Sequence, residues 1–353
     1  MSVTTVIRHR FFWPVLALVV LLVSNVFFTP DFFKLEVRDG HLYGSLIDIL
    51  RNGAPLILVA TGMTVVIATG GIDLSVGSVV AIVAGLACYY ISKQPDQNAV
   101  SGVLTAVALG LGLALLLGLW NGVLVAGIGI QPIVATLILM VAGRGLAQLI
   151  TGGQIITINS DPYDLIGAGY LFTVPFAILV ALFVVFLAVL LTRRTALGML
   201  IESVGGNAEA SRLAGIRSRR ITIMVYVFCA FCAGIAGLMV SSDVSSANGN
   251  DAGLWIELDA ILAVVIGGTS LLGGRFSIAG TVLGALIIQT LTTTIYTTGI
   301  PPEVTLLFKA LVVTIVCLLQ SPAFRAKVFR GRRRPVAPPA TPASEEPKVE
   351  VPA

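Results

Sequence analysis

The chain has 353 residues, of which 56% are hydrophobic and only 11% are charged, and its formal net charge is +4. Soluble domains usually carry about 25% charged residues, so this composition excludes an ordinary soluble protein. The apolar runs are continuous rather than alternating, which excludes a membrane β-barrel. We therefore predict an all-α polytopic membrane protein.

Apolar runs within residues 11–320 predict about ten transmembrane helices. In chain order the runs are 11–29, 54–69, 74–91, 102–127, 132–150, 170–191, 221–241, 259–272, 277–298 and 304–320. A helix needs about 20 apolar residues to cross a bilayer, so the second and eighth runs are short and predict tilted or broken helices. The first run follows a basic stretch, as in a signal peptide, but it is long and has no small-residue cleavage site. We interpret it as a retained span.

Positive charge is concentrated in three segments that ten spans put on one side of the membrane. These are the N-terminus (1–10), the segment 193–220 and the tail (321–353). Lys and Arg mark the cytoplasmic side, so both termini are expected there, and the basic charge indicates topology and contact with anionic lipid rather than nucleic acid. The tail is basic at first and then rich in Pro and Ala, which predicts disorder. The loops expected outside include Asp161, Asp164, Asp243, Asp251 and Glu257, without Lys or Arg.

The sequence lacks the residue patterns of bond-making chemistry. The four cysteines lie in or beside apolar runs, and we interpret "CAFC" (229–232) as two small residues at a helix contact. Two distant histidines make no metal site, and zinc spacings, a Ser-His-Asp arrangement and a phosphate-binding loop are absent. We predict that the chain is not an enzyme, binds no metal or cofactor, and leaves any use of ATP to another subunit.

The stretch "GGIDLSVGS" (70–78) places a carboxylate and flexible backbone between two apolar runs. Asp73 and Ser75 stand where the next helix is expected to begin, and an Asp there can bind the free N–H groups of the helix end. Two interpretations stay open: a tight cytoplasmic turn, or a broken helix lining a path, since non-helical backbone at membrane depth must be buried or beside water. A similar glycine-rich stretch at 267–280 suggests an internal repeat.

Polar side chains within the spans are costly in hydrocarbon and are therefore candidates for a solute path. Trp120 beside Asn121 combines an apolar ring for the C–H face of a sugar with an amide for its hydroxyls, so we favour a path at Asn121. Arg144 and Gln289 are also candidates. For these two residues, hydrogen bonds between helices or snorkelling to an interface are an equal alternative.

The stretch "GNAEASRLAGI" (206–216) predicts a short helix within the basic segment. Asn207 is suited to the N-cap, Glu209 to the first turn, Arg212 to the later part and Gly215 to the C-terminal stop. An isolated helix of this length is marginal in water. We expect it to dock, either on its own protein or in a groove of a motor subunit.

Four segments together resemble those of the permeases of ribose-type bacterial ABC sugar importers: "GGIDLSVGSVVAIVAG", "QPIVATLILMVAGRGLAQ", "GGNAEASRLAGI" and "LDAILAVVIGGTSLLGGRFSIAGTVLGA". The resemblance covers nearly all of the chain up to about residue 320. The galactofuranose importer permeases are the most similar subgroup, through "DGHLYGSLIDIL", "IATGGIDLSVG", "LILMVAGRGLAQLITGGQI" and "NDAGLWIELDAILAVVIGG". Asp251 stands where an Asn is expected, and the Pro-rich tail has no expected counterpart.

The resemblance implies an inner-membrane permease subunit that works by alternating access. It also implies a second, similar permease chain in a heterodimer, a twin-domain ATPase that holds ATP and Mg, and a periplasmic sugar-binding protein. Residues 205–216 would be the coupling helix, with contacts from Gly206, Asn207, Glu209, Arg212, Leu213 and Gly215. The binding protein would dock at Asp243, Asp251 and Glu257, and the sugar route would pass Asp73, Ser75, Trp120, Asn121, Arg144 and Gln289.

Two other functions are compatible with such a bundle. A secondary sugar transporter driven by an ion gradient, with Asp73 as proton carrier, would not need a docked helix at 205–216. Its transport would persist without any ATPase. A membrane scaffold that transports nothing would leave the costly Arg144 and Asn121 without a purpose.

Overall fold

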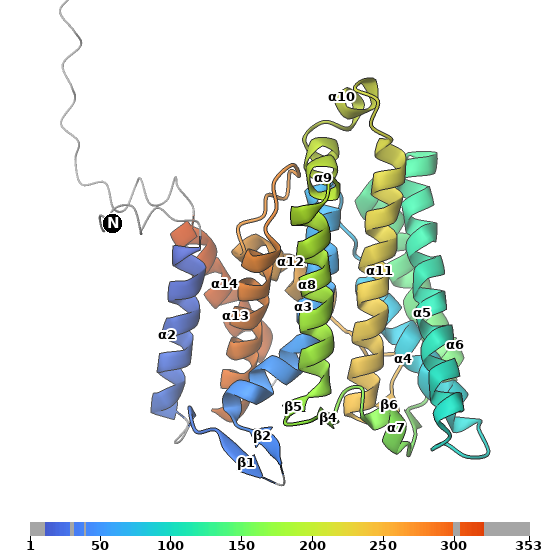
Figure 1. The fold of residues 1–353 in the computed structure, drawn as a ribbon, viewed down its shortest axis with the longest axis vertical. Coiled ribbons are helices and arrows are strands. Elements are labelled where there is room, and N and C mark those ends of the chain that lie inside the picture. The colour runs from blue at the N-terminus through green and yellow to red at the C-terminus, as the bar shows by residue number, and fades with distance from the viewer. Residues whose placement is uncertain (1–10, 29–31, 39, 299–303, 321–353) are drawn as a thin grey trace, which may run out of the picture.

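The chain forms a bundle of helices that stand side by side, with short strands at one end (Figure 1). The computed structural model describes residues 11–28, 32–38, 40–298 and 304–320. Its helices are α2 (Phe12–Phe28), α3 (Ser45–Ala68), α4 (Val76–Ser92), α5 (Val100–Gly122) with its π-helical continuation η1 (Val123–Ile128), α6 (Pro132–Thr151), α7 (Asp161–Asp164), α8 (Phe176–Arg194), α9 (Leu197–Gly206), α10 (Ala208–Leu213), α11 (Ser218–Asp243), α12 (Ile256–Ile266), α13 (Ile278–Thr297) and α14 (Thr305–Gln320).

The strands form three antiparallel pairs that the sequence did not predict. They are β1 (Glu36–Arg38) with β2 (His41–Tyr43), β3 (Ile156–Thr157) with β6 (Ser246–Ala247), and β4 (Tyr170–Leu171) with β5 (Val174–Pro175). In register, Val37 lies opposite Leu42 and Ile156 opposite Ala247. All three pairs lie at the end of the bundle opposite α9 and α10 (Figure 1). We call these the strand end and the α10 end.

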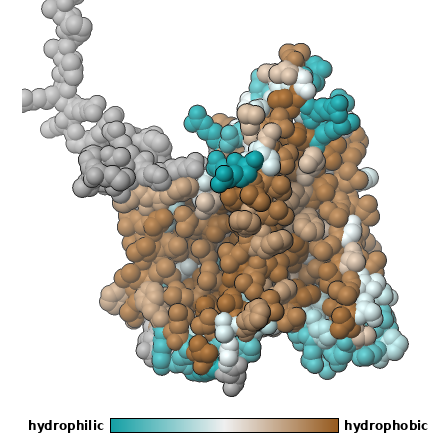
Figure 2. All heavy atoms as spheres, viewed as in Figure 1, coloured by the Kyte–Doolittle hydropathy of each residue, from teal (hydrophilic) through white to brown (hydrophobic). Residues whose placement is uncertain are grey.

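Helices form at all ten predicted apolar runs, and six of the described helices are long and apolar enough to cross a membrane. An apolar band separates two polar ends of the molecule (Figure 2). This distribution matches a body surrounded by lipid, and it confirms the prediction of a helical membrane protein. The N-terminal segment 1–10 and the tail 321–353 lie outside the described residues.

Two predicted boundaries are wrong. The second run is not short, because α3 begins at Ser45 and extends over 24 residues with Pro55 inside it. The polar Asp48 and Arg51 in its first turns hid this beginning from a search for apolar residues. The run expected from residue 170 starts as a helix only at Phe176, because the preceding residues form β4 and β5. The eighth run is short, as predicted, since α12 has 11 residues.

The ends of α6 show how local chemistry sets a boundary. Pro132 occupies the first turn, where its missing N–H is no loss, and Gly152 ends the helix with φ +62°, a conformation that glycine adopts freely. The boundary at Pro132 was readable from the sequence, and the predicted run 132–150 differs from the observed helix by one residue.

Helix α11 runs through the middle of the bundle, packed against α3, α4 and α5. Glycines permit this close approach: a Cβ on Gly62 of α3 would lie 2.8 Å from the Cα of Cys229, and one on Gly237 of α11 would lie 2.6 Å from the carbonyl oxygen of Val80. Cys229 and Cys232 are both buried free thiols, and both lie against Gly62 of α3. The "CAFC" pair therefore lies at a helix contact, as small residues do in membrane bundles.

Candidate functional site

The stretch "GGIDLSVGS" forms a buried break between two helices and not a surface turn. Helix α3 ends at Ala68, Gly70 turns the chain with φ +81°, and α4 begins only at Val76. Asp73 is 1% exposed, so it faces neither solvent nor lipid in this conformation. Of the two interpretations left open by the sequence, the geometry matches the broken helix.

Three predicted route residues meet at this break. The carboxylate oxygen Oδ1 of Asp73 accepts hydrogen bonds from the Ser75 backbone N–H at 3.0 Å and from the Ser75 hydroxyl at 2.6 Å. Asn121 of α5 donates from Nδ2 to the Ser75 hydroxyl oxygen at 2.8 Å. All three side chains are buried, so they tie the break to α5 inside the bundle.

Two of the three remaining route candidates, Trp120 and Gln289, lie away from the break. Trp120 is 56% exposed on the outer face of α5, while the adjacent Asn121 is buried. Neighbours on a helix point in different directions, so the predicted pairing of ring and amide around one sugar does not occur. Gln289 lies on α13 against Gly53 of α3 and donates to Thr293 at 3.5 Å. Its surroundings match the alternative interpretation, a contact between helices.

Arg144 binds the non-helical segment between α11 and α12. Its guanidinium donates from Nη1 to the carbonyl oxygens of Ala252 at 2.7 Å, Gly249 at 3.4 Å and Asn250 at 3.4 Å. One turn further along α6, Gln148 donates to the Asn250 side chain at 2.6 Å. The part of this segment after β6, residues 248–255, is therefore held to α6 by two polar side chains, and we call it the 248–255 loop.

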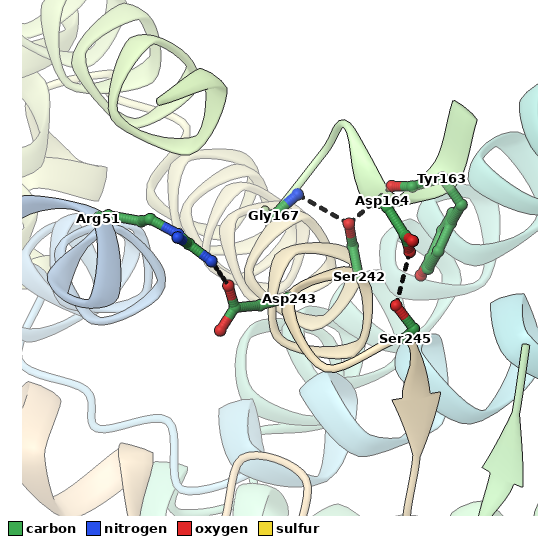
Figure 3. Close-up of polar contacts among 7 residues, drawn as sticks. All are labelled: Arg51, Tyr163, Asp164, Gly167, Ser242, Asp243 and Ser245. Carbon is green, nitrogen blue, oxygen red and sulfur yellow. Dashed lines mark hydrogen bonds and ion pairs between the residues drawn. The ribbon is translucent and has the colours of Figure 1, made fainter. Parts of the chain in front are cut away.

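The acidic residues expected at a docking surface differ in exposure. Glu257 is 3% exposed and lies against Gly77, in the first turn of α4. A buried carboxylate cannot contact a docked protein, so the geometry does not match the docking role predicted for Glu257. Asp243 pairs with Arg51 of α3 (Figure 3). Asp251 is exposed and accepts a hydrogen bond from Asn248, which leaves it the most available of the three.

At the strand end, α11 is fixed by hydrogen bonds between distant parts of the chain, which no sequence pattern predicts. The Ser242 hydroxyl donates to the Tyr163 carbonyl oxygen at 2.6 Å and accepts from the Gly167 N–H at 2.7 Å (Figure 3). The Ser245 hydroxyl donates to Asp164 at 2.8 Å. These bonds hold the position from which the 248–255 loop enters the bundle.

At the opposite end, the predicted short helix forms. Asn207 caps α10 by accepting from the Ala210 N–H at 2.9 Å, and Gly215 stops the chain with φ +87°. Glu209 and Arg212 form an exposed ion pair at 2.6 Å, in which the guanidinium lowers the pKa of the Glu209 carboxyl. Leu213 is 77% exposed at the tip. A large apolar side chain presented on a small projecting helix is suited to contact with another protein.

Close contacts at glycines connect the end of α9, which leads into α10, to the break at Asp73. A Cβ on Gly205, at the end of α9, would collide with the carbonyl oxygen of Ala68 and lie 2.7 Å from the backbone nitrogen of Gly274. A Cβ on Gly273 would lie 2.9 Å from the nitrogen of Gly70. The Gly274 N–H donates to Ala68 at 3.0 Å. The two glycine-rich stretches compared in the sequence therefore meet directly, and the end of α9 packs against both.

Sequence reasoning missed two features of these sites. Trp255 precedes α12 with φ +65°, and Tyr226 of α11 lies against Gly71 in the break. No sequence pattern indicates that Tyr226 approaches the break, because the contact joins distant parts of the chain. Among the described residues, no group of three or more His, Cys, Asp or Glu side chains could hold a metal ion.

Comparison with known proteins identifies relatives along almost the whole chain. Residues 45–317 match the family described as the branched-chain amino acid transport system / permease component. The chain is 49% identical over 338 residues to the galactofuranose transporter permease of Escherichia coli (strain K12), covering 94% of this chain and 97% of that protein. It is 42% identical over 316 residues to the fructose import permease of Bifidobacterium longum, covering 88% and 87%. It is 34% identical over 333 residues to the ribose import permease of Escherichia coli (strain K12), covering 91% and 99%. No solved structure matches the chain.

Proposed function

Because the chain belongs to the branched-chain amino acid transport system / permease component family, we propose that it is the inner-membrane permease of an ATP-driven importer for galactofuranose or a similar monosaccharide. That it is a permease subunit of an ABC sugar importer follows from the family and from its sugar-importing relatives. The particular sugar, the subunit composition and the orientation are the proposed parts.

Sequence identity to known permeases favours galactofuranose over other monosaccharides as the transported sugar. Identity to the galactofuranose permease is 49%, against 42% for the fructose permease and 34% for the ribose permease of the same Escherichia coli strain. The sugars named for these relatives are all monosaccharides. We propose that this chain takes a sugar of that size.

The observation that carries the proposed mechanism is the exposed tip of α10. Leu213 and the Glu209–Arg212 pair project beyond the apolar band, and the adjoining turn carries Arg217, Arg219 and Arg220. We propose that this tip docks into a separate twin-domain ATPase, which binds ATP and Mg. Movement of α10 would reach the break at Asp73 through the glycine contact between α9 and α3.

The proposed orientation puts the α10 end in the cytoplasm. The described ends of α2 and α14 nearest the two termini lie at the α10 end (Figure 1), where the basic segment 193–220 also lies. The positive-inside rule assigns this end to the cytoplasm. The strand end would then face the periplasm, where a sugar-binding protein would dock near Asp243 and Asp251. A second, similar permease chain would complete a heterodimer.

Reconstitution into vesicles tests this function. The permease pair, the ATPase and the sugar-binding protein are placed in proteoliposomes, and uptake of radiolabelled galactofuranose is measured beside fructose and ribose. We expect uptake that requires ATP and all subunits, with galactofuranose as the preferred sugar. Uptake that persists without the ATPase and follows an ion gradient would replace this proposal with a secondary transporter.

A further inference from the structure

The 248–255 loop runs through the body of the bundle without helical structure. One side of it is packed: a Cβ on Gly249 would lie 2.8 Å from the carbonyl oxygen of Ala147 in α6, and one on Gly253 would lie 2.6 Å from Val80 in α4. The loop therefore lies directly against two helices. Its other side is exposed at Asn250, Asp251, Leu254 and Trp255.

The end of this loop is deep in the membrane region. Glu257, two residues after Trp255, lies against Gly77 in the first turn of α4. From Gly77, α4 runs to Ser92, near the strand end, which is about 22 Å at 1.5 Å per residue. Trp255 is thus far from the strand end, near the middle of the apolar band.

A non-helical segment such as the 248–255 loop cannot border lipid at this depth in the membrane. Non-helical backbone in the hydrocarbon region is tolerated only where protein buries it or where it lines a water-filled cavity. The polar Asn250 and Asp251, together with Gln148 of α6, would also be costly in contact with acyl chains. The exposed side of the 248–255 loop must therefore face water or protein.

Trp255 has an unusual backbone conformation for its size. Its φ of +65° lies in the left-handed region, which a bulky residue adopts rarely and only with backbone strain. Glycine would hold this turn without strain. The ring is 46% exposed, so burial in the fold does not account for its presence.

We propose that Trp255 is the aromatic surface on which the sugar stacks as it passes the middle of the membrane. This proposal rests on the proposed function. An apolar ring next to a few fixed polar groups is the usual composition of a small-molecule site. Here Gln148 and Asn250, which bond to each other at 2.6 Å, carry the polar groups for the hydroxyls, and the Arg144 guanidinium holds the loop against α6. The sugar route thus passes the 248–255 loop instead of Trp120.

Substitutions at Trp255 that distinguish the role of the ring from the role of the left-handed backbone conformation test this proposal. W255G keeps the left-handed turn and removes the ring, and W255F keeps an aromatic ring. W120A, on the exposed outer face of α5, is the matched control for loss of an exposed tryptophan. Each variant is purified in the complete importer, and galactofuranose uptake is measured over a range of concentrations, together with basal ATP hydrolysis and recovery of the second permease.

We expect W255G to raise the KM for uptake at least about tenfold, which corresponds to about 1.4 kcal/mol of sugar binding. W255F is expected to stay within about threefold of the wild type, W120A to be unchanged, and ATP hydrolysis and assembly to be normal in all three. Uptake by W255G that equals the wild type would overturn the proposal. Loss of the second permease from W255G complexes would also overturn it, because the ring would then be a subunit contact. Absence of uptake by the wild type would instead count against the proposed function.

Discussion

The side chains of Asp73, Ser75 and Asn121 show what a polar residue in an apolar sequence does and does not reveal. The high cost of burying such groups marked all three as candidates for a solute path, and the structure joins them to one another by hydrogen bonds of 2.6–3.0 Å. The direction of a side chain was harder to infer. Trp120 and Asn121 are adjacent in sequence but face opposite environments, since helix neighbours are rotated by about 100°.

Replacing Asp73 by Asn should impair uptake more than replacing Ser78 by Ala. Asp73 accepts two hydrogen bonds from Ser75 within the buried break, and an amide is a weaker acceptor that adds two donors there. A buried donor without a partner costs about 1–3 kcal/mol. The Ser78 hydroxyl donates only to the carbonyl oxygens of Ser75 and Leu139, which keep their backbone partners at the start of α4 and within α6 when the hydroxyl is removed.

Uptake rates of the two variants, normalised to the amount of permease in the membrane, make this comparison. Equal and mild losses would show that the Asp73 carboxylate has no special part in the break, and that Asn fulfils the same structural role.

At the scale of elements, hydrophobic runs predicted where helices form but not how they break or continue. The beginning of α3 was missed because Asp48 and Arg51 interrupt the apolar pattern, although their position near the strand end lets both reach polar surroundings. The strand pairs were missed because two- and three-residue strands carry no periodic signal. Helix α10 was predicted residue by residue, because its cap and its stop are local properties of Asn207 and Gly215.

The adjacent glycines at the end of α9 provide a matched pair of variants. A Cβ at Gly205 would collide with Ala68, at the end of α3, whereas a Cβ at Gly206 would meet nothing within 4 Å. Overpacking of this kind costs about 1–3 kcal/mol. We therefore expect Gly205→Ala to lower the thermal unfolding midpoint of the purified protein by several degrees and to reduce the sugar imported per ATP hydrolysed. Gly206→Ala should change neither quantity.

The thermal unfolding midpoint is measured with a thiol-reactive dye, whose fluorescence rises as buried cysteines become exposed. If both variants behave alike, α9 does not transmit movement through its contact with α3.

At the scale of the whole molecule, the charge pattern and the fold agree on one arrangement. The basic segment 193–220 and the described chain ends nearest both termini lie at the α10 end (Figure 1), while the acidic Asp243, the last residue of α11, lies at the strand end. The sequence could predict that the basic segments share one end, because Lys and Arg gather in the loops on one side of a membrane protein. It could not predict that α4 and α12 both begin inside the bundle, because those positions depend on contacts such as Glu257 with Gly77 between distant segments.

Cysteine labelling tests the orientation. Leu213 at the α10 end and Val244 near the strand end are both exposed, at 77% and 61%. In intact spheroplasts we expect a membrane-impermeant maleimide to label V244C but to label L213C only after permeabilisation. The wild-type chain, with its four cysteines, gives the background. Labelling of L213C from outside would reverse the proposed orientation.

The central claim is that this chain forms the sugar path but is driven by an ATPase through α10. Replacing Leu213 by Asp puts a charge on the most exposed apolar side chain of that helix, where it disturbs no contact within the fold. In proteoliposomes with the complete importer, we predict that L213D inserts normally but imports little galactofuranose while ATP hydrolysis continues. L213M, which keeps an apolar side chain, should import normally. Wild-type import by L213D would contradict the claim.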